Sequence, residues 1–242
     1  LQMDGLTPRI HEFIRGRDLV DEKLRAIEHC TEAGLQVVLS VTVIPGVNDE
    51  HLWDLILFAI ERRLTGINFQ ALTLSGRFPA RLSHPPRHFT SGHFLKQVEV
   101  QSEGRLRAED LDPIPCPDTR CALICYALLR DGEIIPLKRL VPERQLSELE
   151  ADISDWETVL AKLGMDGSGC GCSQAQCCTQ EPRTVVPGTD FFSIGFHGMM
   201  DAHNFDLQRA KRCCVHELTP DGRLIPFCLY NIKYRNGGCS LT

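Results

Sequence analysis

The grouping of cysteines is the main chemical signal in this sequence. The 242 residues contain 12 cysteines, and all of them except Cys30 lie at or beyond Cys116. The chain is too long and too rich in helix patterns for a secreted disulfide scaffold. Grouped thiols in such a chain are typical of zinc or iron–sulfur ligands, with disulfides or free buried thiols as the alternative.

Five of these cysteines have the spacing of one shared metal site. Two lie in one loop and three far along the chain: Cys116, Cys121, Cys213, Cys214 and Cys228. Thiolate sulfur is the soft donor that holds the iron of a [4Fe–4S] cluster, but a structural zinc ion would use the same residues. Adjacent side chains of an extended segment point apart. We therefore expect one of Cys213 and Cys214 to bind directly, and favour Cys214.

A second cysteine group lies in a Gly- and Ser-rich insert at residues 165–182. Its members are Cys170, Cys172, Cys177 and Cys178. The insert has no periodicity, so we interpret it as flexible. Labile metal binding, a contact between chains or redox-active thiols would fit it, and so would an insert without a role.

Other polar residues give weaker signals. His197, His203 and His216 lie near the cysteine groups and could serve as ligands or proton donors, although single histidines are more often ordinary surface or core residues. We expect Asp201 and Asp206 to cap turns rather than to catalyse. The sequence has no Walker loop, GxGxxG, G-x-S-x-G or HExxH motif.

The first part of the chain has the pattern of α/β units. Helices are expected at 18–33 and 50–64, and strands at 36–44 and 66–72, after a strand stub at 1–4. Asn48 or Asp49 is the expected cap of the second helix. The loop at 44–49 is either a tight turn or, because Gly46 lets a ligand approach the backbone, part of a site. Alternating strands and helices predict a parallel sheet with ligands at the carboxyl ends of its strands.

The second part of the chain has hairpin patterns. Hairpins are expected at 121–140, around Asp131-Gly132, and at 215–230, around Pro220-Asp221-Gly222. Helices are expected at 91–100, capped by Ser91, and at 146–163. The cysteines at the ends of both hairpins could frame a small metal site between them.

Composition narrows the class. The hydrophobic content of 43% and charged content of 24% permit an ordinary packed core. A net charge of −6 argues against nucleic acid as a partner. No apolar run approaches the roughly 18 residues that a membrane-spanning helix needs, so we expect a cytoplasmic protein.

Several motifs resemble the radical S-adenosylmethionine (SAM) superfamily. The segment from Leu1-Gln2-Met3-Asp4-Gly5 through Gly46-Val47-Asn48 to Gln70 looks like the second half of a radical SAM barrel, as in the cyclase of molybdenum-cofactor synthesis. Downstream motifs resemble tetraether lipid synthases and class D radical SAM methylases: Pro115-Cys116-Pro117, Phe205-Asp206, Cys213-Cys214-Val215-His216 and Asp221-Gly222-Arg223-Leu224-Ile225-Pro226-Phe227-Cys228.

The superfamily's Cys-x3-Cys-x2-Cys motif is absent from the 242 residues. Cys121 and Cys125 have the first spacing, but Leu128 stands at the third position. The resemblance therefore implies a C-terminal portion, inactive alone, with the SAM-cleaving [4Fe–4S] cluster on a missing N-terminal segment. The implied fold is α/β: the C-terminal part of a partial (β/α) barrel at 1–100, then a small cysteine-rich α+β iron–sulfur domain at 101–242.

The resemblance also implies the chemistry. A 5′-deoxyadenosyl radical made from SAM would abstract hydrogen from an unactivated carbon of a lipid or pterin-like substrate, for methylation or C–C bond formation. Gln2, Ser40, Ile44 and Gln70 lie at positions expected to contact SAM. The cysteine hairpins would hold an auxiliary [4Fe–4S] cluster.

The implied partners are a small-molecule or lipid substrate and an electron donor such as ferredoxin or flavodoxin. Transient contact with a membrane surface is compatible with the composition. The main rival hypothesis is a non-enzymatic binding module on an α/β scaffold, stabilised by zinc or a cluster. A pterin or nucleotide cyclase is a weaker one.

Overall fold

A computed structural model of the chain describes residues 1–75, 88–114, 118–130, 132–140 and 190–234. The expected helix at 146–163, the insert at 165–182 with its four cysteines, Cys116 and Cys239 lie outside the described residues. So does Asp131, the first turn residue of the first hairpin.

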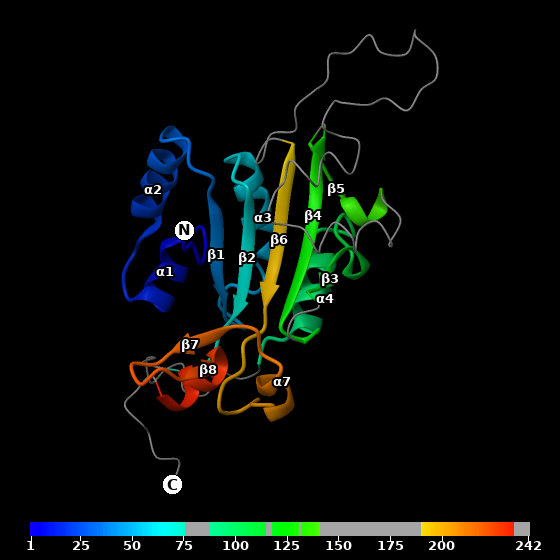
Figure 1. The fold of residues 1–242 in the computed structure, drawn as a ribbon. Coiled ribbons are helices and arrows are strands. Elements are labelled where there is room, and N and C mark those ends of the chain that lie inside the picture. Colours follow the sequence, from blue (N-terminus) through cyan, green and yellow to red (C-terminus); the bar gives the residue numbers. More distant parts are fainter. Residues whose placement is uncertain (76–87, 115–117, 131, 141–189, 235–242) are drawn as a thin grey trace.

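The expected α/β units are present in the first part of the chain (Figure 1). Helix α1 spans Pro8–Arg15 and α2 spans Val20–Glu32, followed by β1 (Val38–Val43), α3 (Leu52–Glu61) and β2 (Gly66–Ala71). Four of these five elements were predicted by their apolar patterns, but α1 was not expected. The expected cap of α3 was wrong: the helix begins after His51, while Asn48 and Asp49 bond within the preceding loop.

The main sheet combines strands from both parts of the chain. Its order is β1-β2-β6-β4-β3, where β6 spans Phe191–His197, β4 spans Ala122–Arg130 and β3 spans Asp112–Pro113. β1, β2 and β6 are parallel, β4 runs antiparallel to β6, and β5 (Glu133–Pro136) pairs with β4. Gln2 adds a parallel bridge to Ser40 at the other edge. The sheet is therefore rich in parallel strands, which agrees with a partial barrel.

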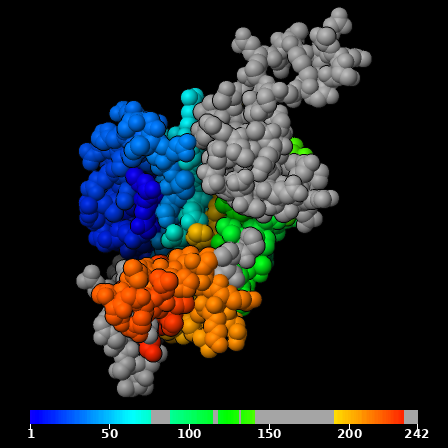
Figure 2. Space-filling model, viewed as in Figure 1, coloured from blue at the N-terminus to red at the C-terminus, as the bar shows by residue number. Residues whose placement is uncertain are grey.

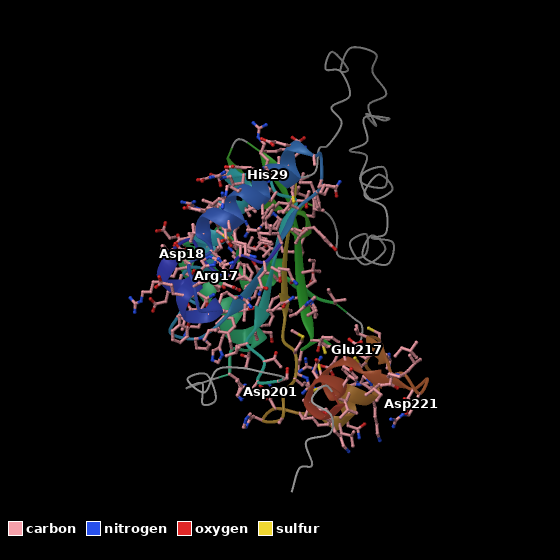
Figure 3. All side chains as sticks on the ribbon, turned by 90° about the vertical axis from the view of Figure 1, so that its left-hand side faces the viewer. Arg17, Asp18, His29, Asp201, Glu217 and Asp221 are labelled. Atoms are coloured by element: carbon pink, nitrogen blue, oxygen red, sulfur yellow. The ribbon has the colours of Figure 1, made fainter. Side chains whose placement is uncertain are left out.

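The two faces of the sheet differ in chemistry. Val41, Phe69 and Phe196 are fully buried on the face covered by α2, α3 and α4 (Ser91–Gln101), which Figure 3 shows on one side of the strands. α4 begins after Thr90, whose side chain caps the helix in place of the expected Ser91. On the other face, which we call the polar face, alternating positions carry half-buried polar residues: Ser40, Thr42, Asn68, Gln70, Ser193 and His197.

The chain after β6 forms a small unit beyond the carboxyl ends of the parallel strands. It contains α7 (Leu207–Lys211), the expected hairpin of β7 (His216–Leu218) and β8 (Leu224–Pro226), and short helices at Phe227–Leu229 (α8) and Tyr230–Tyr234 (η4). Figure 2 shows these orange and red residues as a lobe below the blue N-terminal helices. We call this unit, together with residues 118–121, the cysteine region.

Short 3-10 helices complete the described elements, at Ala108–Asp110 (η2) and Leu137–Arg139 (η3). No helix among the described residues is long and apolar enough to cross a membrane.

Candidate functional site

Three of the five predicted metal ligands converge in the cysteine region. Cys121 lies in the turn before β4, Cys213 follows α7, and Cys228 lies in α8. Burial raises the pKa of the Cys228 thiol, and the charges of Cys213 and Cys121 raise it further, so these two thiols lie within electrostatic reach of Cys228. The Met200 N–H, 3.4 Å from the Cys228 Sγ, and Arg209 act in the opposite direction.

Cys213 and Cys214 differ in their exposure and contacts, which bear on which of them can join a shared metal site. Cys213 is half-buried and its thiol donates to the Val215 carbonyl at 3.1 Å, whereas Cys214 is exposed. The thiol that acts on Cys228 is that of Cys213. This geometry favours Cys213 over Cys214, which the sequence had suggested as the direct ligand.

Arg209 is the cation of the cysteine region. Its side chain is buried, with 9% of the residue exposed, and its Nε donates to the Cys121 Sγ at 2.9 Å. A second guanidinium nitrogen donates to the Gly198 carbonyl at the end of β6. Within the described residues Arg209 forms no ion pair with a carboxylate. The buried guanidinium thus places a positive charge beside the Cys121 sulfur, and its charge opposes the rise that burial causes in the pKa of Cys228.

Asp118 joins the two segments that carry Cys121 and Cys213. Its carboxylate accepts from the Arg120 Nε at 2.8 Å and from Arg212 at 2.7 Å, and Arg120 also reaches Asp206 at 3.0 Å. The Arg120 guanidinium and backbone N–H, and secondarily the charge of Arg212, hold the pKa of Asp118 well below its usual range. The Asp118 carbonyl in turn accepts from the Cys121 N–H at 2.8 Å. Cys121 is thus held at its sulfur by Arg209 and at its backbone N–H by Asp118.

The thiols fit a soft metal in chemistry but do not form a finished ligand shell. Among the described residues, no three His, Cys, Asp or Glu side chains are close enough to hold a metal ion as they stand. The predicted fourth ligand, Cys116, lies outside those residues. Cys125 faces the core of the sheet instead, where burial raises its pKa strongly, and it is not near a ligand set.

Two of the four predicted SAM contacts lie at the carboxyl ends of parallel strands: Gln70 near the end of β2 and Ile44 just after β1, whereas Ser40 and its bridge partner Gln2 lie midway along β1. Gln2, Ser40 and Gln70 are half-buried on the polar face, and the Gln2 amide donates to Thr42 Oγ1 at 3.2 Å. Ile44 is 3% exposed, and its N–H donates to the Asn48 Oδ1 at 2.8 Å. The first three side chains are therefore accessible to a ligand and that of Ile44 is packed.

A buried polar network beside these residues was missed. Asp4 is 1% exposed and binds Arg15 Nε at 2.7 Å and the Thr42 N–H at 2.9 Å. The fully buried Asn48 amide donates to the carbonyls of Asp4 and Thr42, both at 2.8 Å. It ties the first segment to β1 and its loop. The sequence indicated Asp4 as part of a strand stub and Asn48 as a possible helix cap, both within motifs of the resemblance, but not their contact with each other.

The remaining predicted residues have mostly structural contacts. Asp201 accepts from the backbone of Leu74 and His203, and Asp206 caps α7, which confirms their expected capping roles. His216 is exposed. His197 ends β6 with its pKa lowered by burial, so its ring is neutral at neutral pH.

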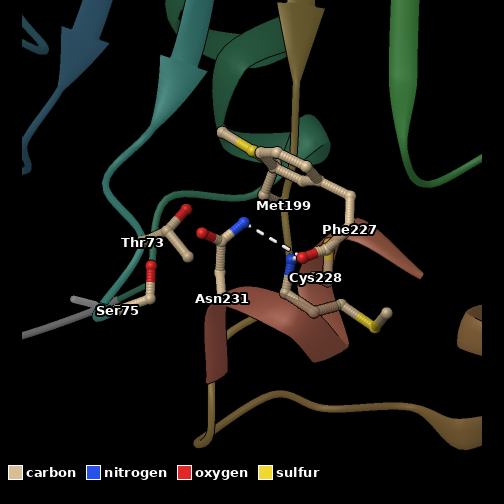
Figure 4. Close-up of a pocket in the computed structure, with 7 residues that line it drawn as sticks. Thr73, Ser75, Met199, Phe227, Cys228 and Asn231 are labelled. Atoms are coloured by element: carbon tan, nitrogen blue, oxygen red, sulfur yellow. Dashed lines mark hydrogen bonds between the residues drawn. The ribbon is translucent and has the colours of Figure 1, made fainter. Parts of the chain in front are cut away.

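A small cavity lies where the sheet meets the cysteine region (Figure 4). It has a volume of about 100 Å³ and is lined by Thr73, Ser75, Met199, Met200, Phe227, Cys228 and Asn231. The Asn231 amide donates to the Phe227 carbonyl at 3.0 Å, which fixes one wall. Cys228 thus faces both the thiol group and a pocket at the strand ends.

The fold and this site define a class that comparison with known proteins identifies. A family model described as the Radical SAM superfamily matches residues 1–59. Together with the similarity described next, this match confirms the resemblance to radical SAM enzymes, a family that implies SAM and a [4Fe–4S] cluster.

The chain is 28% identical to 7,8-dihydro-6-hydroxymethylpterin dimethyltransferase of Methanocaldococcus jannaschii, over 97% of this chain and 56% of that enzyme. Probable GTP 3′,8-cyclases of Pyrococcus abyssi and Pyrococcus horikoshii are 36% and 33% identical over 24% and 25% of this chain, and 19% and 20% of their own lengths. The chain thus spans about half of the methyltransferase and a fifth of each cyclase.

Proposed function

We propose that this chain is the SAM-barrel and auxiliary-cluster part of a radical SAM enzyme that methylates an unactivated carbon of a pterin-like small molecule. Methylation is preferred to C–C coupling because the similarity that covers most of the chain is to a methyltransferase. A pterin-like substrate is preferred to a lipid because the face toward the barrel interior is lined by polar residues.

The observation that carries the proposal is the environment of the thiols. Arg209, a buried cation without a carboxylate partner among the described residues, contacts Cys121 and acts on Cys228. These groups lie at the carboxyl ends of the parallel strands, where α/β folds bind ligands. Cys121, Cys213 and Cys228 would hold the auxiliary cluster, with Cys116 as the fourth ligand.

SAM, its cluster and the residues of this chain would have separate roles. When bound, SAM and its reduced cluster supply the radical that abstracts hydrogen. Gln2, Ser40 and Gln70 would orient SAM by hydrogen bonds, and Asp4 and Asn48 hold their strands in place. Arg209 would hold the Cys121 sulfur in place through the hydrogen bond from its Nε. A ferredoxin or flavodoxin would supply the electron.

The absence of one cysteine motif limits the chemistry expected of the isolated chain. The 242 residues contain no Cys-x3-Cys-x2-Cys motif. We therefore expect the isolated chain to bind one auxiliary cluster but not to cleave SAM.

Anaerobic purification followed by iron and sulfide analysis tests the proposal. We expect a brown protein with about four iron atoms per chain, lost in Cys213→Ala and Cys228→Ala. Cys125→Ala is the matched control, because this thiol is buried in the sheet core and should leave the iron content unchanged. Cys214→Ala should also retain iron if Cys213 is the ligand.

A colourless protein that contains zinc would contradict the proposal. It would support the rival function, a zinc-stabilised binding module, for which the small β7–β8 hairpin beside the thiols is a suitable frame. Loss of iron in the Cys125→Ala control, with the protein folded, would also contradict the assignment of the ligands.

A further inference from the structure

The polar face contains hydrogen-bonding groups that the fold itself does not use. Parallel register places Asn68 beside Gly195, and Gln70 beside His197, on neighbouring strands β2 and β6. Asn68, Gln70 and His197 are half-buried. Among the described residues, none of the three side chains forms a hydrogen bond with another residue. Because these side chains are only half-buried and the fold leaves them without a hydrogen bond, a ligand can reach them and use their donors and acceptors.

Gly195 creates the space in this row. A Cβ atom at this position would lie 2.7 Å from the Asn68 Oδ1 and 3.7 Å from the Ile124 Cδ1. The carboxamide of Asn68 therefore reaches across the backbone of β6, next to the apolar Ile124. Glycine at this buried position leaves room for the Asn68 carboxamide to lie against the backbone of β6, on the same face of the sheet as His197.

The row carries no formal charge. Ser40, Asn68 and Gly195 form one level of the sheet, and Thr42, Gln70 and His197 form the next, without a Lys, Arg, Asp or Glu among them. Arg15 touches the row at Thr42 Oγ1, at 3.4 Å, but its charge is paired with Asp4. At Asn68 and His197 a phosphate or carboxylate would have no charged partner within the row, and an alkyl chain would leave the amides unpaired. The chemistry instead suits a neutral ring with several hydrogen-bonding atoms.

We propose that Asn68 and His197, on either side of Gly195, form the substrate subsite and bind the edge of a neutral heterocycle that carries a ring amide. A carboxamide presents one donor and one acceptor in a plane, and a ring amide presents the complementary acceptor and donor. His197 binds a second polar atom of the same ring. The choice of a ring amide rests on the proposed function, whereas the subsite itself rests on the row of unpaired groups.

The subsite also adjoins the cysteine region. Gly198, the residue after His197, donates its N–H to the Cys121 carbonyl at 2.9 Å and accepts from Arg209. A ring held at Gly195 and His197 would lie one residue along the strand from the backbone that anchors Cys121. Substrate and auxiliary cluster would thus be neighbours.

Equilibrium dialysis of the purified full-length protein with pterin, guanosine and adenosine tests the subsite. Pterin and guanosine share the ring-amide edge, so we expect both to bind and to compete with each other. Adenosine is a part of SAM and could bind at the proposed SAM contacts, so we expect it to bind without displacing pterin. Tighter binding of pterin identifies a pterin-like substrate, and tighter binding of guanosine a guanine nucleotide. Asn68→Ala should weaken both about tenfold, which is the loss of one hydrogen bond in a partly buried site.

Further variants separate a specific loss of binding from misfolding. Gly195→Ala should weaken binding by displacing the Asn68 carboxamide, although it removes no functional group. Gln36→Ala, at an exposed glutamine just before β1, should bind as the wild type does. Thermal melting identifies any variant that is unfolded, and for a folded Asn68→Asp we expect a loss at least as large as for Asn68→Ala.

Several results would overturn the subsite. They are unchanged affinity in a folded Asn68→Ala variant, displacement of pterin by adenosine, or no binding of either ring amide. Binding does not require iron or SAM cleavage, so its outcome is separate from that of the proposed function. If the protein binds pterin but no iron, the subsite stands and the proposed function fails. If it cleaves SAM but does not bind pterin, only the enzyme class stands.

Discussion

The sheet and its helices are held together by fully buried apolar side chains, whereas the segments of the cysteine region are held together by charged and polar contacts. Phe94 of α4 lies between Phe69 and Phe196, with ring centroids 5.3 and 4.7 Å away, and is completely buried. In the cysteine region the corresponding connections are Asp118 to Arg120 and Arg212, and Arg209 to Cys121. Both regions adjoin the same strand ends.

This difference explains how one chain can carry a rigid and a ligand-dependent part. Apolar burial stabilises the sheet whether or not a cofactor is bound. The cysteine region depends on charged and polar contacts, and under the proposed function a bound metal or cluster would contribute directly to its folding. We therefore expect substitutions in the two regions to respond differently to salt and to pH.

The largest expected effect is in the sheet. Phe94→Ala should lower the free energy of unfolding by about 3–5 kcal/mol, because it removes a buried aromatic ring and leaves a cavity. Urea unfolding at low and at 1 M salt measures it, and the loss should be the same at both because no charge is involved. Val100→Ala, exposed on the same helix, is the control and should change stability little.

A result in which Phe94→Ala costs less than 1 kcal/mol would contradict an apolar origin of the sheet's stability. If salt altered the loss strongly, the separation between the two regions would fail as well.

An intermediate effect is expected at Arg209. In metal-free protein Arg209→Gln should cost about 2 kcal/mol, since the charged hydrogen bonds to Cys121 and Gly198 are lost from a buried position. It should also slow alkylation of Cys228 near pH 8, because the Arg209 charge, which acts to lower the pKa of this thiol, is gone. Arg17→Gln, at an exposed ion pair, is the control. Faster alkylation in Arg209→Gln would contradict the role assigned to this cation.

The sequence predicted the sheet region better than the cysteine region. The run at 36–44 and the amphipathic pattern at 18–33 depend on local periodicity, so β1 and α2 were found within a few residues. β6 was missed because it follows the cysteine-rich insert and includes Gly195, and its place between β2 and β4 depends on contacts distant in sequence. No local pattern could show that Arg209 reaches Cys121, 88 positions away.

The functional residues divide in the same way. Gln2, Ser40 and Gln70 could be proposed by resemblance because strands place them regularly. Asn68 and His197 were not singled out as a pair, since only the register of β2 with β6 makes them neighbours. The choice between Cys213 and Cys214 also required the structure, because α7 and the turn after it decide which thiol is half-buried.

The smallest expected effect is at Asp118, and it tests the charged side of the comparison by its pH dependence. Folding lowers the pKa of Asp118, because Arg120 and Arg212 bind its ionised form. The folded protein therefore binds this proton less tightly than the unfolded chain does. The resulting stability is fully present above the unfolded pKa, about 3.9, and is lost as the pH falls below it.

Asp118→Asn should accordingly lower the free energy of unfolding at pH 7 by about 1 kcal/mol, a modest value because both arginines are more than half exposed and screened by solvent. The difference from the wild type should shrink steadily between pH 4 and pH 2, and also in 1 M salt at pH 7. Urea unfolding across this pH range measures both trends. Glu22→Gln, at the exposed pair with Arg17, should show a smaller difference throughout. A gap between Asp118→Asn and the wild type that persists at low pH would mean that Asp118 acts through its shape and neutral hydrogen bonds. In that case the cysteine region would be held together in the same manner as the sheet.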